Sequence, residues 1–305
     1  MKISVVIPAY QAAATIKDAI SSVLAQTFTD YEILVVDDGS RDGTSSLVAS
    51  FRDDRVRLLA YSTNKGAAAA RNTGIQAARA ELIAFLDADD LWLPEKLARQ
   101  VDLMDGHPEY GGCVTGFRYE TEEGISLEIT RKPASWIREF SKGCAVAPGT
   151  TLMVRHMCYD SVGYYDEAMP RHEDFDWLLR FVQKYDLGVV ELPLATVRRS
   201  GQPSGEAIGA GNEILVKRHR DLFYRLGRFR GSQAVGKRWL ETSIHYFMVG
   251  NRRMGFSYFL RAIRENPFQR VTMYLRIIDY SLGLNIFSAL KKNILKARLI
   301  FRSGK

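Results

Sequence analysis

The stretch F-L-D-A-D-D-L-W, residues 85–92, places three carboxylates directly after a run of apolar residues. A short apolar run that stops at polar residues is typical of a buried strand. Ligands of open α/β sheets gather outside the carboxyl ends of the strands. Asp87, Asp89 and Asp90 therefore either form a site at a strand end or act as turn and cap residues, a role in which aspartate is also favoured. The stretch alone leaves both interpretations open.

The segments around this stretch predict an open α/β sheet. Helix-like segments alternate with expected strands at residues 3–7, 31–36, 56–60 and 81–86. Strands that alternate with helical patterns indicate βαβ units and a mostly parallel sheet flanked by helices. Because parallel strands end at one edge of a sheet, we expect Tyr10, Asp38 and Asp87 to lie along one cleft.

The pattern is less regular after Asp90. It predicts a helix over 93–104, strands over 111–119, 150–154 and 189–192, and a helix that follows the segment H-E-D-F-D-W at 172–177. Residues 121–141 have no clear pattern. Residues 198–212 are rich in Gly and Ser, which predicts a loop.

The composition is that of an ordinary globular protein, with 305 residues of which 46% are hydrophobic and 25% charged. Three scattered cysteines, Cys113, Cys144 and Cys158, are too few for a disulfide framework or a thiolate metal site. The first apolar run is too short for a signal peptide, and no segment approaches the ~18 apolar residues of a membrane span. We therefore expect a cytoplasmic protein.

The net charge of +7 conceals an asymmetry between the two ends of the chain. Residues 1–215 have 22 Lys and Arg against 31 Asp and Glu, whereas residues 216–305 have 20 against 4, a net charge of +16. We predict a domain over 1–212 and a basic helical region over 213–305. The region's expected helices are 239–249 and 254–263, with up to two more in 271–301.

Three roles are open for this basic region. Basic and apolar residues recur at helical spacing, which suits an anionic membrane surface on the cytoplasmic side. The helices could instead be structural or join copies of the chain into a homo-oligomer. Nucleic-acid binding is disfavoured because the sequence has no nucleic-acid-binding motif.

Five motifs in chain order resemble the inverting family 2 of glycosyltransferases. They are V-V-I-P-A-Y at 5–10, D-D-G-S-R-D-G-T at 37–44, N-K-G-A-A-A-A-R-N-T-G at 64–74, F-L-D-A-D-D-L-W at 85–92 and H-E-D-F-D-W at 172–177. The resemblance covers residues 1–200. It implies the GT-A fold and a nucleotide-diphospho-sugar donor, which we expect to be a UDP-sugar.

The resemblance also implies roles for individual residues on the donor side. The predicted nucleotide-sugar contacts are Pro8, Ala9, Tyr10, Asp38, Lys65, Arg71, Asp87 and Ala88. Lys65 could equally be an ordinary turn residue, and Arg71 an exposed helix residue. The family's metal ligand corresponds to Asp89, with Asp87 beside the ribose and the metal and Asp90 as a supporting residue.

A divalent metal suits such a donor for chemical reasons. Mg²⁺ is typically held by one or two carboxylates together with substrate phosphates. Mg²⁺ or Mn²⁺ held in this way would stabilise the charge that develops on the departing diphosphate. Many family members also have a His in a loop after the last core strand, but residues 197–202 contain none. Arg198 and Arg199 are alternative diphosphate contacts. A second departure is Gln11, where the family usually has Asn.

Inversion by direct displacement requires a general base that accepts the proton of the acceptor hydroxyl. By resemblance this base is Asp174, and Glu173 would hold Asp174 or the acceptor in place. Asp176 is the local alternative, although a carboxylate near a helix N-terminus can be favoured for capping alone. Trp177 is expected in the core.

The sequence thus predicts an inverting, metal-dependent hexosyltransferase of polysaccharide or surface-glycan biosynthesis, with a saccharide or lipid-linked acceptor. A non-catalytic nucleotide-sugar-binding module of the same fold is the alternative. A sugar nucleotidyltransferase is disfavoured because such enzymes need a Gly-rich, Arg-containing loop after the first strand, and Y-Q-A-A-A at 10–14 has neither residue.

Overall fold

The computed structural model describes residues 1–121, 124–198 and 204–267. The chain forms two compact units, Met1–Gln202 and Pro203–Lys305, hereafter unit 1 and unit 2. The border lies ten residues before the position between 212 and 213 that the sequence pattern indicates.

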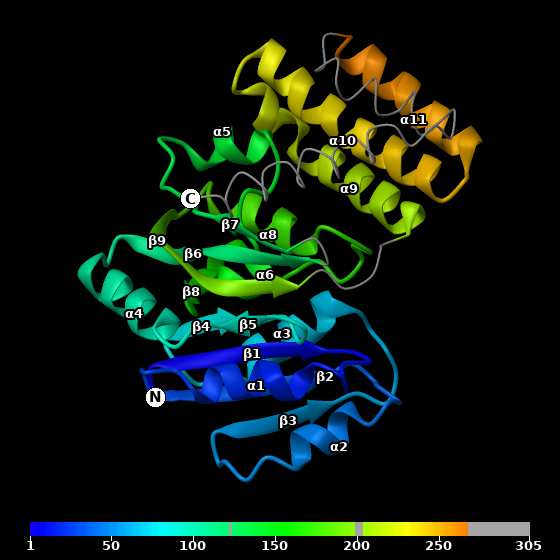
Figure 1. The fold of residues 1–305 in the computed structure, drawn as a ribbon. Helices are drawn as coiled ribbons and strands as arrows, with labels where there is room; N and C mark the ends of the chain where they lie inside the picture. The colour runs from blue at the N-terminus through cyan, green and yellow to red at the C-terminus, as the bar shows by residue number, and fades with distance from the viewer. Residues whose placement is uncertain (122–123, 199–203, 268–305) are drawn as a thin grey trace, which may run out of the picture. The chain divides into compact units, whose positions relative to one another are not determined.

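Unit 1 is a mixed α/β structure. Its strands are β1 (Ile3–Ala9), β2 (Tyr31–Asp37), β3 (Val56–Ala60), β4 (Leu82–Phe85), β5 (Leu91–Trp92), β6 (Tyr110–Thr121), β7 (Gly124–Glu128), β8 (Met153–Arg155) and β9 (Asp186–Arg198). Its described helices are α1 (Ile16–Leu24), α2 (Thr44–Ala49), α3 (Ala67–Ala77), α4 (Lys96–Gly106), α5 (Trp136–Ser141), α6 (Pro148–Thr151), α7 (Cys158–Val162) and α8 (Glu173–Phe181). The sheet order is β3-β2-β1-β4-β8-β6-β9-β5, and β7 pairs with β6 (Figure 1).

The first half of the sheet is parallel. Strand β1 pairs with β2 and β4, and β2 pairs with β3, all in parallel. The register joins Ala9 to Asp37, Asp37 to Ala60 and Val6 to Phe85. These strands therefore end at one edge, as the sequence predicts. Antiparallel pairs enter with β8, which lies between β4 and β6.

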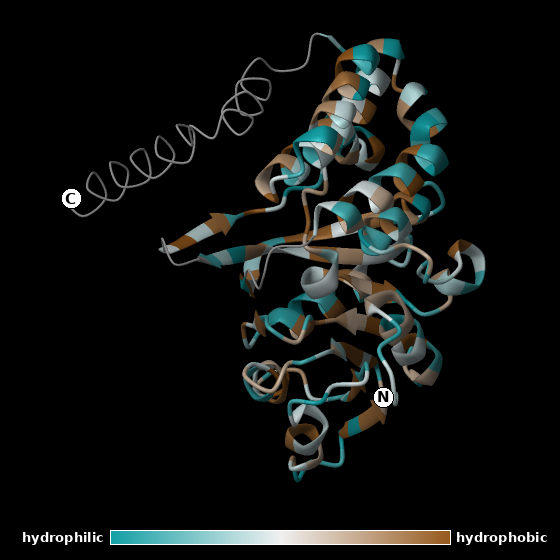
Figure 2. Cartoon of the chain, turned by 90° about the vertical axis from the view of Figure 1, so that its right-hand side faces the viewer, coloured by the Kyte–Doolittle hydropathy of each residue, from teal (hydrophilic) through white to brown (hydrophobic). Residues whose placement is uncertain are grey.

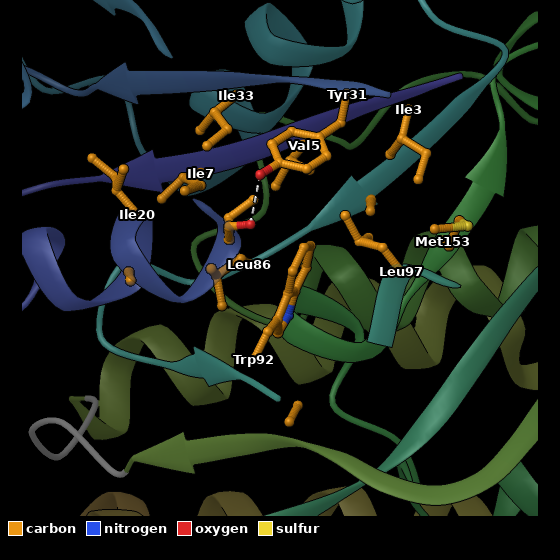
Figure 3. Close-up of a cluster of buried hydrophobic side chains, with 14 of the residues drawn as sticks. Ile3, Val5, Ile7, Ile20, Tyr31, Ile33, Leu86, Trp92, Leu97 and Met153 are labelled. Carbon is orange, nitrogen blue, oxygen red and sulfur yellow. Dashed lines mark hydrogen bonds between the residues drawn. The ribbon is translucent and has the colours of Figure 1, made fainter. Parts of the chain in front are cut away.

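The central strands are buried because helices cover both faces of a parallel sheet, and such strands have nearly continuous apolar sequences. Residues Val5–Ile7 in β1 and Ile33–Val36 in β2 are buried. Side chains of β1 and β2 pack against α1 and against Trp92 and Leu97 (Figure 3). The hydroxyl of Tyr31 in this cluster donates a hydrogen bond of 2.8 Å to the carbonyl of Val23. This rigid core carries the loops that follow β1, β2 and β4.

Unit 2 contains α9 (Gly205–Tyr224), α10 (Arg228–Met248) and α11 (Arg252–Glu265) among its described residues. The predicted helices over 239–249 and 254–263 are confirmed as parts of α10 and α11, and the predicted segment 271–301 lies outside the described residues. In Figure 2 these helices show both hydrophilic and hydrophobic stretches. No helix among the described residues combines the length and apolar character that crossing a membrane requires.

The loop predicted over 198–212 is wrong for residues 205–212, which belong to α9. The glycines of this stretch permit close helix packing. A Cβ on Gly209 would lie 3.2 Å from the Tyr246 ring of α10, and a Cβ on Gly205 would lie 3.4 Å from the same ring. Ser204 caps the helix by accepting a hydrogen bond from the Ala207 N–H. The Gly- and Ser-rich composition therefore marks a helix start and a helix–helix contact.

Candidate active site

Asp38 follows β2 and holds the turn that leads into α3. Its two carboxylate oxygens accept hydrogen bonds from the backbone N–H groups of Lys65 (2.6 Å) and Gly66 (2.8 Å). The residue is only 2% exposed. The next residue, Gly39, has φ +77° and lies so close to Thr63 that a Cβ would be 2.7 Å from its carbonyl carbon. Asp38 thus connects the end of β2 to the start of α3, the helix that follows β3.

The end of β1 lies at the same edge. Pro8 and Ala9 are the last residues of the strand, and Tyr10 follows them with 52% of its surface exposed. Gln11 has φ 50°, in the left-handed region where Asn is enriched among non-glycine residues. The backbone N–H of Gln11 donates to the Ser40 hydroxyl (2.8 Å), so the loops after β1 and β2 are connected. The family's usual Asn therefore matches a backbone requirement that Gln11 also meets.

Lys65 lies in the turn before α3. Its ammonium group lies 4.3 Å from the centre of the Tyr61 ring, a cation–π distance. Its backbone N–H donates to Asp38, as described above. The structure therefore places Lys65 beside the strand-end edge through both its backbone and its side chain.

Arg71 of α3 connects the two acidic parts of the site. One guanidinium nitrogen donates to Asp87 (2.8 Å), and the other donates to Glu173 (2.7 Å). The arginine is buried, with 5% of its surface exposed. Glu173 lies 102 residues away in sequence, at the start of α8. A single cation thus links the acid after β4 to the acid beside Asp174.

Asp174 lies in the first turn of α8. Burial raises the pKa of its carboxyl to about 6, and the negative charges of Glu173 and Asp87 act in the same direction, while Arg71 opposes them. One carboxylate oxygen accepts a hydrogen bond from the Phe175 N–H (2.7 Å). A carboxylate with this pKa is ionised at neutral pH and still accepts a proton readily, which a general base requires.

The helix that carries Asp174 has a distinctive start. His172, its N-cap residue, has φ 68°, which is uncommon for a residue other than glycine. The alternative base, Asp176, is fully buried and accepts a hydrogen bond of 3.0 Å from Arg180. Trp177 is also buried, and its indole N–H donates to the Gly163 carbonyl (2.7 Å). Asp176 and Trp177 are therefore anchored in the core of unit 1.

Asp90 is the buried member of the strand-end triplet. It accepts hydrogen bonds from the Thr150 hydroxyl and from the Arg198 backbone N–H (2.8 Å). Burial, together with the charge of Asp87, raises the pKa of Asp90 to about 8. The Arg198 side chain forms an ion pair with Glu120 (2.8 Å). Asp90 therefore attaches α6 and the end of β9 to the acidic turn, and Arg199 lies outside the described residues.

The remaining acids of the turn suit a divalent metal in part. Asp87 is 38% exposed at its side chain, and Asp89 is half-buried. No group of three or more His, Cys, Asp or Glu side chains in the described ranges could by itself enclose a metal ion. Two carboxylates with oxygen donors fit Mg²⁺ or Mn²⁺ when phosphates complete the coordination. Ala88, between them, is buried.

Three further residues shape the site, and the sequence reasoning did not identify them. A Cβ on Gly149 would lie 2.3 Å from an Asp87 carboxylate oxygen, so α6 packs directly on this acid. Thr150, the next residue, bonds Asp90. Asn72 exchanges hydrogen bonds of 3.0 Å with the backbone of Tyr165 and so holds the chain before α8. Only Asn72 had a signal, because it adjoins Arg71 in a recognised motif.

Solved structures with the same fold include two that contain a bound nucleotide-sugar. S. aureus TarS 1–349 in complex with UDP-GlcNAc has a TM-score of 0.61 and 18% identity, covering 86% of this chain and 90% of that one. The mannosyltransferase PcManGT from Pyrobaculum calidifontis, in complex with GDP-Man and Mn²⁺, has a TM-score of 0.57 and 17% identity, covering 94% and 87%. These likenesses confirm the predicted GT-A fold.

Relatives with higher sequence identity match about a third of the chain. The Escherichia coli UDP-Glc:alpha-D-GlcNAc-diphosphoundecaprenol beta-1,3-glucosyltransferase WfgD is 47% identical over 102 residues, which are 33% of this chain and 40% of the relative. The succinoglycan biosynthesis protein ExoO of Rhizobium meliloti (strain 1021) is 48% identical over 103 residues, 34% of this chain and 30% of the relative. The chain thus matches less than half the length of either relative.

The family model for "Glycosyl transferase family 2" matches residues 4–159, which are half of the chain. The matched range includes the ends of β1, β2 and β4, together with Arg71 and Gly149. The chain belongs to glycosyl transferase family 2.

Proposed function

We propose that this chain transfers a sugar from a UDP-sugar to the hydroxyl group of a saccharide or lipid-linked acceptor, with inversion at the anomeric carbon. Family membership supports the reaction class. The name of the E. coli relative describes a UDP-glucose donor and an undecaprenol-linked acceptor, and TarS binds UDP-GlcNAc. The observation that carries the proposal is the placement of Asp174 beside the Arg71 bridge, with its pKa raised to about 6.

Asp174 is the general base of this reaction. In a single displacement, the acceptor oxygen bonds to the anomeric carbon while the bond from that carbon to the diphosphate breaks. The acceptor proton passes to the Asp174 carboxylate, and attack from the face opposite the leaving group inverts the configuration. A positioned base of this kind contributes about 10²–10⁴-fold to the rate.

Arg71 and Glu173 position the base. The Arg71 guanidinium binds Glu173 on one side and Asp87 on the other, at 2.7 and 2.8 Å. Asp87 belongs to the donor-side turn. Arg71 therefore fixes the position of this turn relative to α8, the helix that contains Asp174. Its positive charge also opposes the rise in the pKa of Asp174.

The donor side of the site uses the ends of the parallel strands. Tyr10 and Lys65 border the nucleotide, and Asp38 either contacts the base or holds the turn that does so. Asp87 and Asp89 would hold Mg²⁺ or Mn²⁺, which supplies Lewis-acid stabilisation of the departing diphosphate when bound. The Arg198 main chain is bonded to Asp90, so the segment that begins at the end of β9 starts beside this turn.

Asp174→Asn tests the reaction most simply, with Asp160→Asn as a matched control. Asp160 is an exposed acid on α7. We expect Asp174→Asn to lower sugar transfer by about 10²–10⁴-fold while the Kd for the donor nucleotide changes less than about threefold. Asp160→Asn should retain transfer. Transfer near the wild-type rate in Asp174→Asn would show that another group is the base.

A non-catalytic binding module is the alternative function. It predicts tight nucleotide binding by the wild-type chain without turnover of any donor. A thermal-shift screen of UDP-, GDP- and dTDP-sugars, with and without Mn²⁺, identifies the donor. Measurement of nucleotide release with that donor then separates the two functions.

A further inference from the structure

The outer face of α11 exposes apolar side chains between arginines. Phe256 and Leu260, one helical turn apart, are 48% and 52% exposed. Arg252, Arg253 and Arg264 are exposed on the same helix. We call these five residues the α11 outer face. The preceding turn adds Met248 and Val249, which are 41% and 60% exposed.

The opposite face of α11 fixes how the helix is oriented within unit 2. Gly255, Tyr258 and Ala262 are buried. A Cβ on Gly255 would lie 2.9 Å from the Phe247 ring of α10, and the Tyr258 ring stacks on Tyr246 at 5.6 Å. Because this inner face is closely packed, the outer face is a stable feature of the unit.

The charge around the outer face has one sign. Between Glu241 and Glu265 the chain has four arginines and no acidic residue. Arg261 forms an ion pair with Glu213 (2.7 Å). Among the described residues, the three arginines of the outer face form no ion pair. This surface therefore offers apolar side chains and uncompensated positive charge together.

We propose that the α11 outer face docks unit 2 on the surface of an anionic lipid bilayer. A helix that lies in a bilayer interface places apolar side chains at the acyl boundary and basic side chains at the headgroups. Basic residues near an anionic leaflet are each attracted to it. With 14 residues, α11 is about 21 Å long and lies in the interface rather than across it.

Charge complementarity selects this occupant over two others. A second copy of the chain that packed through the same face would be repelled by its like charge. Residues 268–305 contain eight Lys and Arg and one acidic residue, so their charge also has the same sign as the face. An anionic bilayer provides both the opposite charge and an apolar layer.

The inference deepens the proposed function, because a lipid-linked acceptor would be presented at the surface on which α11 docks. The test below measures vesicle binding without donor or acceptor, so its outcome does not depend on catalysis. Asp174→Asn should bind vesicles as the wild type does. If the enzyme is active but does not bind vesicles, only the docking inference is overturned.

Vesicle sedimentation with phosphatidylglycerol and with phosphatidylcholine tests the face. We expect the full chain to bind the anionic vesicles and to lose at least about tenfold of this affinity in the double variant Phe256→Ser, Leu260→Ser. Arg252→Glu with Arg253→Glu should lose at least about fivefold for each arginine replaced. Equal binding to both lipids, or unchanged binding by both double variants, would overturn the inference.

Met157→Ser provides the matched control. Met157 is an apolar side chain of unit 1 and is 62% exposed. This variant should bind anionic vesicles within about twofold of the wild type. An equal loss in Met157→Ser and in the Phe256, Leu260 double variant would mean that general surface apolarity, rather than the α11 outer face, drives binding.

An environment-sensitive dye identifies what covers the face. The dye is attached at Leu260→Cys in a Cys144→Ser background, because Cys144 is an exposed thiol whereas Cys113 and Cys158 are buried. A blue shift that needs anionic vesicles supports docking. A blue shift without vesicles contradicts docking. If that shift depends on protein concentration, a second copy of the chain covers the face. If it does not, another part of the same chain covers the face. A shift with RNA alone would also overturn the proposal.

Discussion

The two units use charge in opposite ways. Unit 1 has 22 Lys and Arg against 29 Asp and Glu, and its functional charges are paired around a buried cation, Arg71, which lies between Asp87 and Glu173. Unit 2 has 20 against 6, and the arginines of its α11 outer face are exposed. Charges that are buried and paired fix the positions and pKa values of reacting groups. Exposed charges of one sign instead attract a large partner of opposite charge.

Arg71→Met breaks the paired charges of unit 1 and has the largest expected effect. It leaves Asp87 and Glu173 without their common cation, and for the mostly buried Glu173 the loss of its partner in the ion pair costs about 3–5 kcal/mol. Urea unfolding measures this loss. Arg99→Met is the control, because Arg99 forms an exposed pair with Glu95 and should cost no more than about 0.5 kcal/mol. Equal stability of the two variants would show that the Arg71 bridge is not a structural link.

Gly149→Ala tests how closely unit 1 positions Asp87. The added Cβ would meet the carboxylate at 2.3 Å and must displace it. A displacement of about 1 Å in an active site can cost 10²-fold in rate, so we expect kcat/KM to fall by about 10–100-fold. Gly106→Ala, at a helical glycine with no atom within 4 Å of the new Cβ, should retain full activity. Full activity in Gly149→Ala would mean that the reaction does not depend on the exact position of the Asp87 carboxylate.

The pH profile of kcat/KM reports the charges that surround Asp174. The pKa of Asp174 is raised to about 6, and the base must be ionised, so kcat/KM should fall about tenfold per pH unit below about pH 6. Glu173→Gln removes a negative charge that raises this pKa, so the acidic limb should move to lower pH. Glu139→Gln, in a local ion pair of Glu139 with Lys142, should leave the limb in place. A limb that moves upward in Glu173→Gln would contradict the assignment.

The smallest effect is expected when a substitution in unit 2 is tested for its effect on the reaction of unit 1. Phe256→Ser with Leu260→Ser should change turnover of a water-soluble acceptor by less than about twofold, because the outer face of α11 contains no reacting group. Initial rates with that acceptor, measured without vesicles, test this. A tenfold loss would show that unit 2 contributes to the reaction itself.

The sequence predicts those parts of unit 1 whose structure depends on local pattern. Strands β1, β2 and β4 are apolar runs buried on both faces, so their ends and the acids that follow could be placed in advance. Strand β7 could not, because its side chains are exposed and it is held by its pairing with β6. The full length of β9 was missed for a similar reason, since its burial is irregular.

The candidate site divides in the same way. The motifs identify Asp87 and Glu173, but a pattern along the chain cannot show that one arginine joins them across 102 residues. Gly149 and Thr150 were missed because their role depends on α6 packing against the strand-end turn. The glycines of α9 were misread because glycine favours both loops and close helix packing, and only the tertiary contact with Tyr246 distinguishes the two.

The anomeric configuration of the product distinguishes the proposed reaction from a retaining one, because a single displacement with Asp174 as base must invert it. Once the donor is known, ¹H NMR of the first product formed by the wild-type chain reports this configuration from the coupling of the anomeric proton. We expect the configuration opposite to that of the donor. Retention would contradict it, since retention requires a second displacement or attack from the same face.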